Sequence, residues 1–136
     1  FGLKDLQQCA VLDAMVWSLC QPVQLVFAET VRESDGLALS SRNQYLSESE
    51  RKQAPALYAC LSQIRDEFKR TSLTLSDLQS RLGSFADGLT SQGFLVDYLE
   101  LVDFPSMGSA VEPARTRIVV AARLGTTRLI DNISLV

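Results

Sequence analysis

The sequence predicts an α+β fold in which helices pack on a short antiparallel sheet, preceded by a helix and a strand of another unit. Three observations support this fold class. Apolar residues recur at helical spacing over residues 6–20 and 47–92. Three segments rich in β-branched residues follow from residue 95 onward, with turn residues between them. A short apolar run, residues 23–27, directly follows Pro22.

A first helix is predicted from Leu6 to Cys20. Its apolar residues recur every three or four positions and are Leu6, Cys9, Leu12, Met15, Val16 and Leu19. Asp5 and Gln8 have the spacing of a capping box, and Pro22 ends the helix. The run at residues 23–27 then predicts a strand buried in a sheet. A helix followed by such a strand is half of a parallel βαβ unit, which needs an earlier strand, so we expect the chain to be truncated at its N-terminus.

Two further helices are predicted in the middle of the chain. Ser47 and Glu50 form a capping-box pair, and a regular 3.6-residue period continues to Arg70. Pro55 lies inside this period, so we expect a kink there or a helix whose regular part begins close to it. A second amphipathic pattern begins at Leu75 and ends near Gly93, where glycine suits a helix C-terminus.

Strands are predicted for residues 95–102, 117–123 and 127–131, and together they should form a small antiparallel sheet. The helices and this sheet can cover each other. We therefore expect two parts: residues 40–136 as one α+β domain and residues 1–39 as the remnant of another domain.

Composition excludes several classes of protein. The 136 residues include 13 basic and 16 acidic side chains, for a net charge of -3, which argues against a general nucleic-acid binder. Histidine is absent, so the commonest general base and every Ser-His or Cys-His nucleophile pair are excluded. Chemistry must depend on lysine, arginine, hydroxyls, carboxylates and backbone amides.

The cysteines and the apolar runs indicate a cytoplasmic protein. Cys9, Cys20 and Cys60 are odd in number, show no paired spacing and lie in or beside apolar runs, so three buried thiols are expected. No apolar run approaches the length of about 20 residues that a membrane-spanning helix needs. No interaction with a membrane is expected.

Residues 30–46 carry the clearest chemical signal. Ser40 and Ser41 can each donate a hydrogen bond to a phosphate oxygen, and the guanidinium of Arg42 can make two charge-assisted ones. Asp35-Gly36 predicts a tight turn within the same segment. Taken alone, such a stretch is more often a solvated loop and a helix cap than a ligand site.

Two more motifs change that balance. The chain begins with FGLKDLQQ and contains ARLGTTRLIDN at residues 122–132. In combination and in this order, the three motifs resemble the pantothenate synthetase family, also called pantoate-β-alanine ligases. The resemblance extends over essentially the whole chain and corresponds to the C-terminal portion of these enzymes. It implies the end of a Rossmann-like nucleotide-binding domain followed by a lid domain.

The resemblance implies an ATP-dependent ligase that condenses pantoate with β-alanine through a pantoyl-adenylate, releasing AMP and pyrophosphate. Carried over residue by residue, it assigns phosphate contacts to Lys4, Ser40, Ser41 and Arg42, ribose contacts to Gly2 and Asp5, an adenine contact to the backbone of Val31, and pantoate to Gln8. Lys4 could equally be a solvated lysine, and Asp5 a helix N-cap. Arg123 and Arg128 of the last motif face either the nucleotide or solvent and are left outside the predicted site. Arg32 and Glu33 are interpreted as residues that order the loop, whether or not they pair with each other.

Several features of the family have no counterpart in these residues: a histidine-containing nucleotide loop, a second pantoate glutamine and the carboxylate that binds Mg²⁺. We therefore expect the fragment alone to be inactive and to need the N-terminal half of the enzyme as its partner. Family enzymes are usually dimers, and some relatives continue into a cytidylate kinase. The alternative is a non-catalytic assembly or binding module of a larger enzyme, without nucleotide contact.

Overall fold

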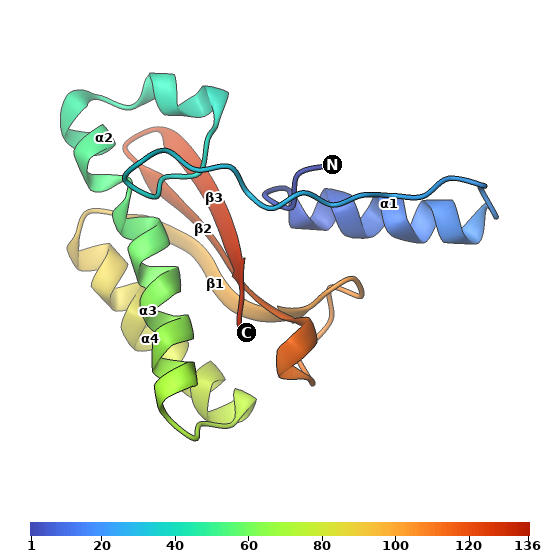
Figure 1. Cartoon of the computed structure of the whole chain (residues 1–136). Coiled ribbons are helices and arrows are strands. Elements are labelled where there is room, and N and C mark those ends of the chain that lie inside the picture. Colours follow the sequence, from blue (N-terminus) through green and yellow to red (C-terminus); the bar gives the residue numbers. More distant parts are fainter.

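The structure, a computed structural model, describes residues 1–136 (Figure 1). Its elements in chain order are α1 (Leu6–Ser18), η1 (Ser41–Tyr45), α2 (Glu48–Gln53), α3 (Ala56–Arg70), α4 (Leu75–Ser91), β1 (Leu95–Asp103), η2 (Pro113–Arg115), β2 (Thr116–Leu124) and β3 (Thr127–Ser134). The predicted α+β class is confirmed. None of the helices combines the length and the apolar character that crossing a membrane requires.

The three strands form one antiparallel sheet in the order β1-β2-β3, as predicted. α3 and α4 cover one face of this sheet, and 19 buried side chains, among them Leu61, Phe94 and Ile118, form the main core there. The opposite face meets the N-terminal turn through a smaller cluster made by Leu3, Leu6, Cys9, Val102 and Val119. The sheet therefore separates a packed helical layer from a face that is covered only in part.

The helical segment expected from Ser47 to Arg70 is interrupted at Pro55, where the sequence predicts it. The capping box of Ser47 and Glu50 begins α2, and regular hydrogen bonding resumes only at α3, after Pro55. A second capping box, made by Thr74 and Asp77, begins α4 and was missed in the sequence. Both boxes satisfy amide groups that would otherwise lack partners at a helix start.

Three expectations about the N-terminal part were wrong. The Asp5 side chain makes no capping bond to α1. Residues 23–27 are extended but belong to no strand, because pairing on this side is limited to a parallel bridge between Gly2 and Ala28. That bridge still gives the short form of a parallel β-α-β connection around α1. Cys20 is exposed, because it lies where the chain turns after the end of α1, whereas Cys9 and Cys60 are buried free thiols.

Candidate functional site

Two adjoining hollows lie between the N-terminal turn, the 37–43 loop and β3. The first encloses about 230 Å³ and is lined by Lys4, Asp5, Leu37, Ala38, Ser40, Ser41, Arg42, Asn43, Leu57, Arg128, Leu129, Ile130 and Asp131. The second encloses about 490 Å³ over the open face of the sheet, and its walls include Gln8, Tyr98, Glu100, Val102 and Val119. Six residues line both hollows: Lys4, Asp5, Arg42, Arg128, Ile130 and Asp131.

Lys4 lies at the junction of the two hollows, just before the start of α1. Its Nζ donates a hydrogen bond to the carbonyl oxygen of Leu39 at 2.8 Å, which joins the N-terminal turn to the loop that carries the two serines. Burial lowers the pKa of Lys4, and the nearby Asp131 carboxylate opposes that effect. Lys4 forms no ion pair, so its charge is available to an anion at this point.

The segment from Ser40 to Asn43 forms the wall facing Lys4. Ser40 Oγ accepts a hydrogen bond from the backbone N–H of Arg42 at 3.3 Å and begins η1. Asn43 Nδ2 donates to Glu33 Oε1 and to the carbonyl oxygen of Ala38, each at 3.2 Å. The guanidinium of Arg42 is exposed and makes no hydrogen bond or ion pair within the chain. The loop is thus held by the side chains of Ser40 and Asn43, while its cation remains free.

The turn before this segment is built as the sequence predicts. Asp35 Oδ1 accepts a hydrogen bond from the backbone N–H of Leu37 at 3.1 Å, and Gly36 has φ of 93°. A Cβ on Gly36 would lie 2.5 Å from Cδ1 of Tyr58, so only glycine fits against this ring. Arg51 of α2 then bridges Glu33 at 2.7 Å and Asp35 at 2.6 Å, which holds the turn against the helical layer.

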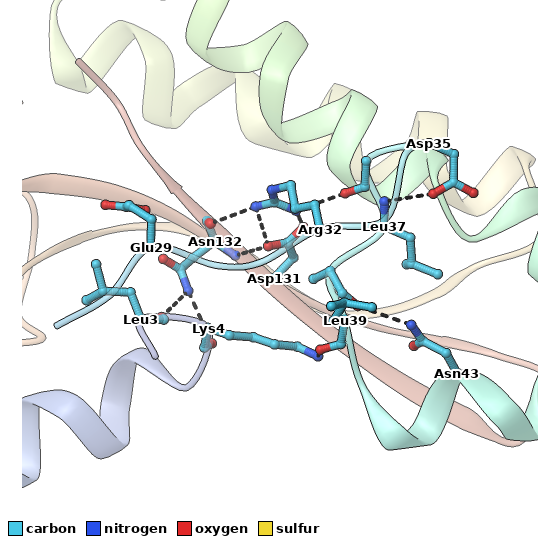
Figure 2. A network of polar contacts seen from close by, with 12 residues as sticks. Leu3, Lys4, Glu29, Arg32, Asp35, Leu37, Leu39, Asn43, Asp131 and Asn132 are labelled. Atoms are coloured by element: carbon cyan, nitrogen blue, oxygen red, sulfur yellow. Dashed lines mark hydrogen bonds and ion pairs between the residues drawn. The ribbon is translucent and has the colours of Figure 1, made fainter. Parts of the chain in front are cut away.

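An ion pair joins this loop to the last strand (Figure 2). Arg32 donates to both carboxylate oxygens of Asp131, at 2.6 and 2.9 Å, and its guanidinium lies 3.8 Å from the centre of the Tyr58 ring. Burial raises the pKa of Asp131, and the hydrogen bonds from Arg32 oppose that rise. Arg32 and Glu33 do order the loop, but each pairs with a residue elsewhere in the chain rather than with the other.

Asn132 completes the connection. Its Nδ2 donates to the carbonyl oxygens of Leu3 at 2.8 Å and Lys4 at 3.2 Å, and its side chain points toward the N-terminal turn in Figure 2. Its Oδ1 accepts a hydrogen bond from Arg117 Nε at 2.8 Å. Neighbouring residues of β3 therefore hold both walls of the first hollow, because Asp131 binds the loop and Asn132 binds the backbone that carries Lys4.

The structure brings most of the sequence-predicted site residues together. Lys4, Asp5, Ser40, Ser41 and Arg42 line the first hollow, and Gln8 lines the adjoining second one.

Gly2 and Val31 lie outside both hollows. The N–H of Val31 makes no backbone hydrogen bond, while its carbonyl accepts one from Leu39 at 2.9 Å. Arg128 and Asp131, which line both hollows, were left outside the predicted site. Both belong to the ARLGTTRLIDN motif, and that membership was the signal available to identify them.

The charges around the hollows suit an anionic ligand. Lys4, Arg42 and Arg128 are the cations on their shared wall, and Asp5 and Asp131 are the carboxylates. Because Asp131 is neutralised by Arg32, the wall carries an excess of positive charge. No group of three or more His, Cys, Asp or Glu side chains is placed to hold a metal ion.

Comparisons with known proteins show the family of the chain. The sequence profile of the family described as Pantoate-beta-alanine ligase matches residues 1–134. A Pantothenate synthetase of Alcanivorax borkumensis is 48% identical over 136 residues, which are 99% of this chain and 47% of that protein. A Pantothenate synthetase of Pseudomonas savastanoi is 46% identical, over 99% of this chain and 47% of that protein. The chain thus spans about half the length of the curated relatives it matches.

Solved structures give the same result. The crystal structure of the Thermus thermophilus Pantothenate synthetase superposes with a TM-score of 0.85 at 38% identity, covering 99% of this chain and 48% of the other. The Pantoate-beta-alanine Ligase of Francisella tularensis, solved in complex with Beta-gamma ATP and Beta-alanine, has a TM-score of 0.68 at 26% identity, covering 98% of this chain and 42% of the other.

Proposed function

This chain belongs to the pantoate-β-alanine ligase family, and we propose that it is part of an ATP-dependent ligase that joins pantoate to β-alanine. The products would be pantothenate, AMP and pyrophosphate. In this proposal residues 1–39 are the end of a Rossmann-like nucleotide-binding domain and residues 40–136 are a lid. The observation that carries the proposal is the unpaired Lys4 and Arg42 facing one hollow together with Ser40 and Ser41.

The first step would be attack of the pantoate carboxylate on the α-phosphate of ATP, with pyrophosphate leaving. Such a step depends on positioning and on countercharges at the phosphates. Lys4 and Arg42 line the same hollow and can supply those charges, and the hydroxyls of Ser40 and Ser41 can donate to phosphate oxygens. Lys4 would exchange its bond to the Leu39 carbonyl for one to phosphate. The start of α1 adds unpaired amides and a favourable dipole nearby.

The remaining assignments follow from residues that the fold leaves free. Asp5 makes no capping bond, so its carboxylate can accept from a ribose hydroxyl beside the backbone of Gly2. The N–H of Val31 can donate to adenine. Gln8 faces the larger hollow, whose apolar walls Val102 and Val119 suit the methyl groups of pantoate. In the second step the amine of β-alanine would attack the acyl carbon of the adenylate and AMP would leave.

The family's Mg²⁺ would bind the triphosphate and offset its charge. Asp5 and Asp131 are the carboxylates at the wall shared by both hollows, and Asp131 is paired with Arg32, so in this proposal the carboxylate that binds the ion comes from the N-terminal half of the enzyme. The residues described here bind and orient the substrates. The Francisella tularensis relative, solved with an ATP analogue and β-alanine, supports ATP and β-alanine as ligands of this family.

Reconstitution tests the proposal directly. The 136-residue chain is mixed with the separately expressed N-terminal half of the Alcanivorax borkumensis relative, and pantothenate formation from ATP, pantoate and β-alanine is measured. We expect product with the wild-type chain, a loss with Lys4→Ala or Arg42→Ala, and full activity with Lys69→Ala, which removes an exposed lysine of α3 outside both hollows. A complex that forms without yielding product would contradict the ligase proposal and favour an assembly module.

A further inference from the structure

Arg128 lines the same two hollows as Lys4 and Arg42, the two cations already assigned. It lies at the start of β3 and, with Lys4 and Arg42, makes the set of three cations on the wall common to both hollows. Its side chain is 37% exposed, so the guanidinium is open to a ligand. Its cross-strand partner in the register is Arg123 of β2, which lines neither hollow.

A β-bulge holds Arg128 in this position. The pairing of β1 with β2 shifts between Val96 and Tyr98, so Asp97 is the extra residue in the ladder. Bulges of this kind re-aim a side chain and are common beside functional sites. Asp97 Oδ2 accepts a hydrogen bond from Arg128 Nε at 2.7 Å, while Arg123 Nε lies 3.6 Å from Oδ1.

The geometry leaves part of Arg128 unused. Asp97 accepts its hydrogen bond from the Nε edge of the guanidinium, and Tyr98, a wall of the second hollow, lies near the same side chain. Nε is the one guanidinium nitrogen of Arg128 that donates a hydrogen bond within the chain. One carboxylate also faces two arginines, which leaves a net positive charge at this end of the sheet. A guanidinium fixed at one edge and free at the other is well suited to grip phosphate oxygens.

We propose that Arg128, held in place by Asp97, is a third cation that binds phosphate oxygens of the nucleoside triphosphate at the hollow of Lys4 and Arg42. This assignment rests on the proposed function for the identity of the ligand. Arg128 is a binding residue in this view, and Asp97 is a positioning residue that acts through it. The bulge of β1 then has a role in the site: it turns a carboxylate from the edge of the sheet toward an arginine on the far strand.

Binding of inorganic pyrophosphate and of ATP to the 136-residue chain, measured by titration calorimetry, tests this assignment. Loss of one charge-assisted contact predicts that Arg128→Ala binds both ligands about ten-fold to a hundred-fold more weakly. Arg123→Ala is the matched control, because Arg123 also faces Asp97 but lines neither hollow. Its affinity for both ligands should stay within about two-fold of wild type. Arg128→Lys, which keeps the charge but lacks the fork, should fall between them. Arg128→Lys also tests the assignment if Arg128→Ala does not fold.

The role of Asp97 is tested by a double-mutant cycle. Asp97→Asn should weaken pyrophosphate binding several-fold, and this effect should disappear when Arg128 is already alanine. A general structural role for Asp97 would instead weaken binding equally in both backgrounds.

The outcomes separate the two proposals. If Arg42→Ala weakens pyrophosphate binding but Arg128→Ala behaves like Arg123→Ala, the assignment of Arg128 is overturned and the proposed function stands. If the wild-type chain binds neither ligand, the proposed phosphate site fails and the assignment of Arg128 fails with it.

Discussion

Removal of the Arg32 guanidinium gives the sharpest test of how this site is held together. In Arg32→Met a side chain of similar length remains, but the buried carboxylate of Asp131 loses its partner. The side chains of Arg32 and Asp131 are 16% and 2% exposed, so the pair is shielded from water. Breaking such a pair by removing one member costs about 3–5 kcal/mol, because a charge is left buried and uncompensated. Asp131 keeps one hydrogen bond, from the N–H of Asn132 at 2.8 Å, which favours the lower end of that range.

The loss should depend on pH in a defined direction. Burial already raises the pKa of Asp131 above its ordinary value of 3.8, and the hydrogen bonds from Arg32 are the strongest influence opposing that rise. Without Arg32 the pKa of Asp131 in the folded chain rises further. A raised folded-state pKa gives a contribution to stability that is present below 3.8 and is lost as pH rises through the folded value. The destabilisation should therefore grow with pH, by at most about 1.4 kcal/mol per pH unit.

Urea denaturation followed by far-UV circular dichroism, at about pH 5 and about pH 8, measures both quantities. Trp17 is 84% exposed, so its fluorescence would report poorly on unfolding. Arg65→Met is the control, since it breaks an exposed pair with Asp66 and should change stability by about 0.5 kcal/mol or less. The double variant Arg32→Met/Asp131→Asn should recover much of the loss. A loss of unfolding free energy below about 1 kcal/mol, or a loss that is equal at the two pH values, would refute the reasoning that Arg32→Met leaves an uncompensated buried charge.

Three further predictions concern the rest of the chain. With a thiol reagent at about pH 8, only the exposed Cys20 should react fast, because burial raises the pKa of Cys60 to about 11. Fast labelling of the Cys20→Ser variant would contradict this prediction. Gly125→Ala should lower the melting temperature, since the residue has φ of 54° and an added Cβ would lie 2.0 Å from a carboxylate oxygen of Glu50 in α2. Gly88→Ala in α4 is the control: its Cβ would meet nothing within 4 Å, so this variant should raise the melting temperature. The hydrogen bonds from Thr74 at the start of α4 hold the pKa of Asp77 below its ordinary value of 3.8, so its contribution to stability is present above that value and is lost as pH falls. Asp77→Asn should therefore make the free energy of unfolding fall less steeply at acid pH. An unchanged slope would rule this out.

The elements that the sequence predicted correctly are those whose signals are local. The period of α3 and α4, the capping box at Ser47 and the break at Pro55 all depend on residues a few positions apart. The strand expected at residues 23–27 failed because a strand also needs a neighbour, and only the short bridge at Ala28 supplies one here. Helix capping at Asp5 failed although its spacing was right, since spacing does not fix the direction of a side chain.

The candidate site divides in the same way. The sequence could single out Lys4 and the serines at 40 and 41, which line one hollow, because each belongs to a short motif. The partner of Arg32 could not be identified, because Asp131 lies 99 positions away and only the fold brings the two together. The place of Arg128 at the hollows could not be predicted for a related reason: its direction depends on a bulge in another strand, which places Asp97 within reach.

Asn132 should control the phosphate site without touching the ligand. Its amide holds the carbonyl oxygens of Leu3 and Lys4, and it is buried, so Asn132→Ala leaves two backbone acceptors without their donor. The turn that carries Lys4 should then loosen, and affinity for pyrophosphate should fall about ten-fold.

If Asn132 acts through the placement of Lys4, the loss on Asn132→Ala should largely vanish in a Lys4→Ala background, because a lysine that is absent cannot be misplaced. Calorimetric titration of the single and double variants measures this coupling, with thermal unfolding as a check that each variant is folded. Equal losses in the two backgrounds would mean that Asn132 affects binding by another route. The coupling expected here follows from the fold, in which the last strand fixes the backbone of the first residues of the chain.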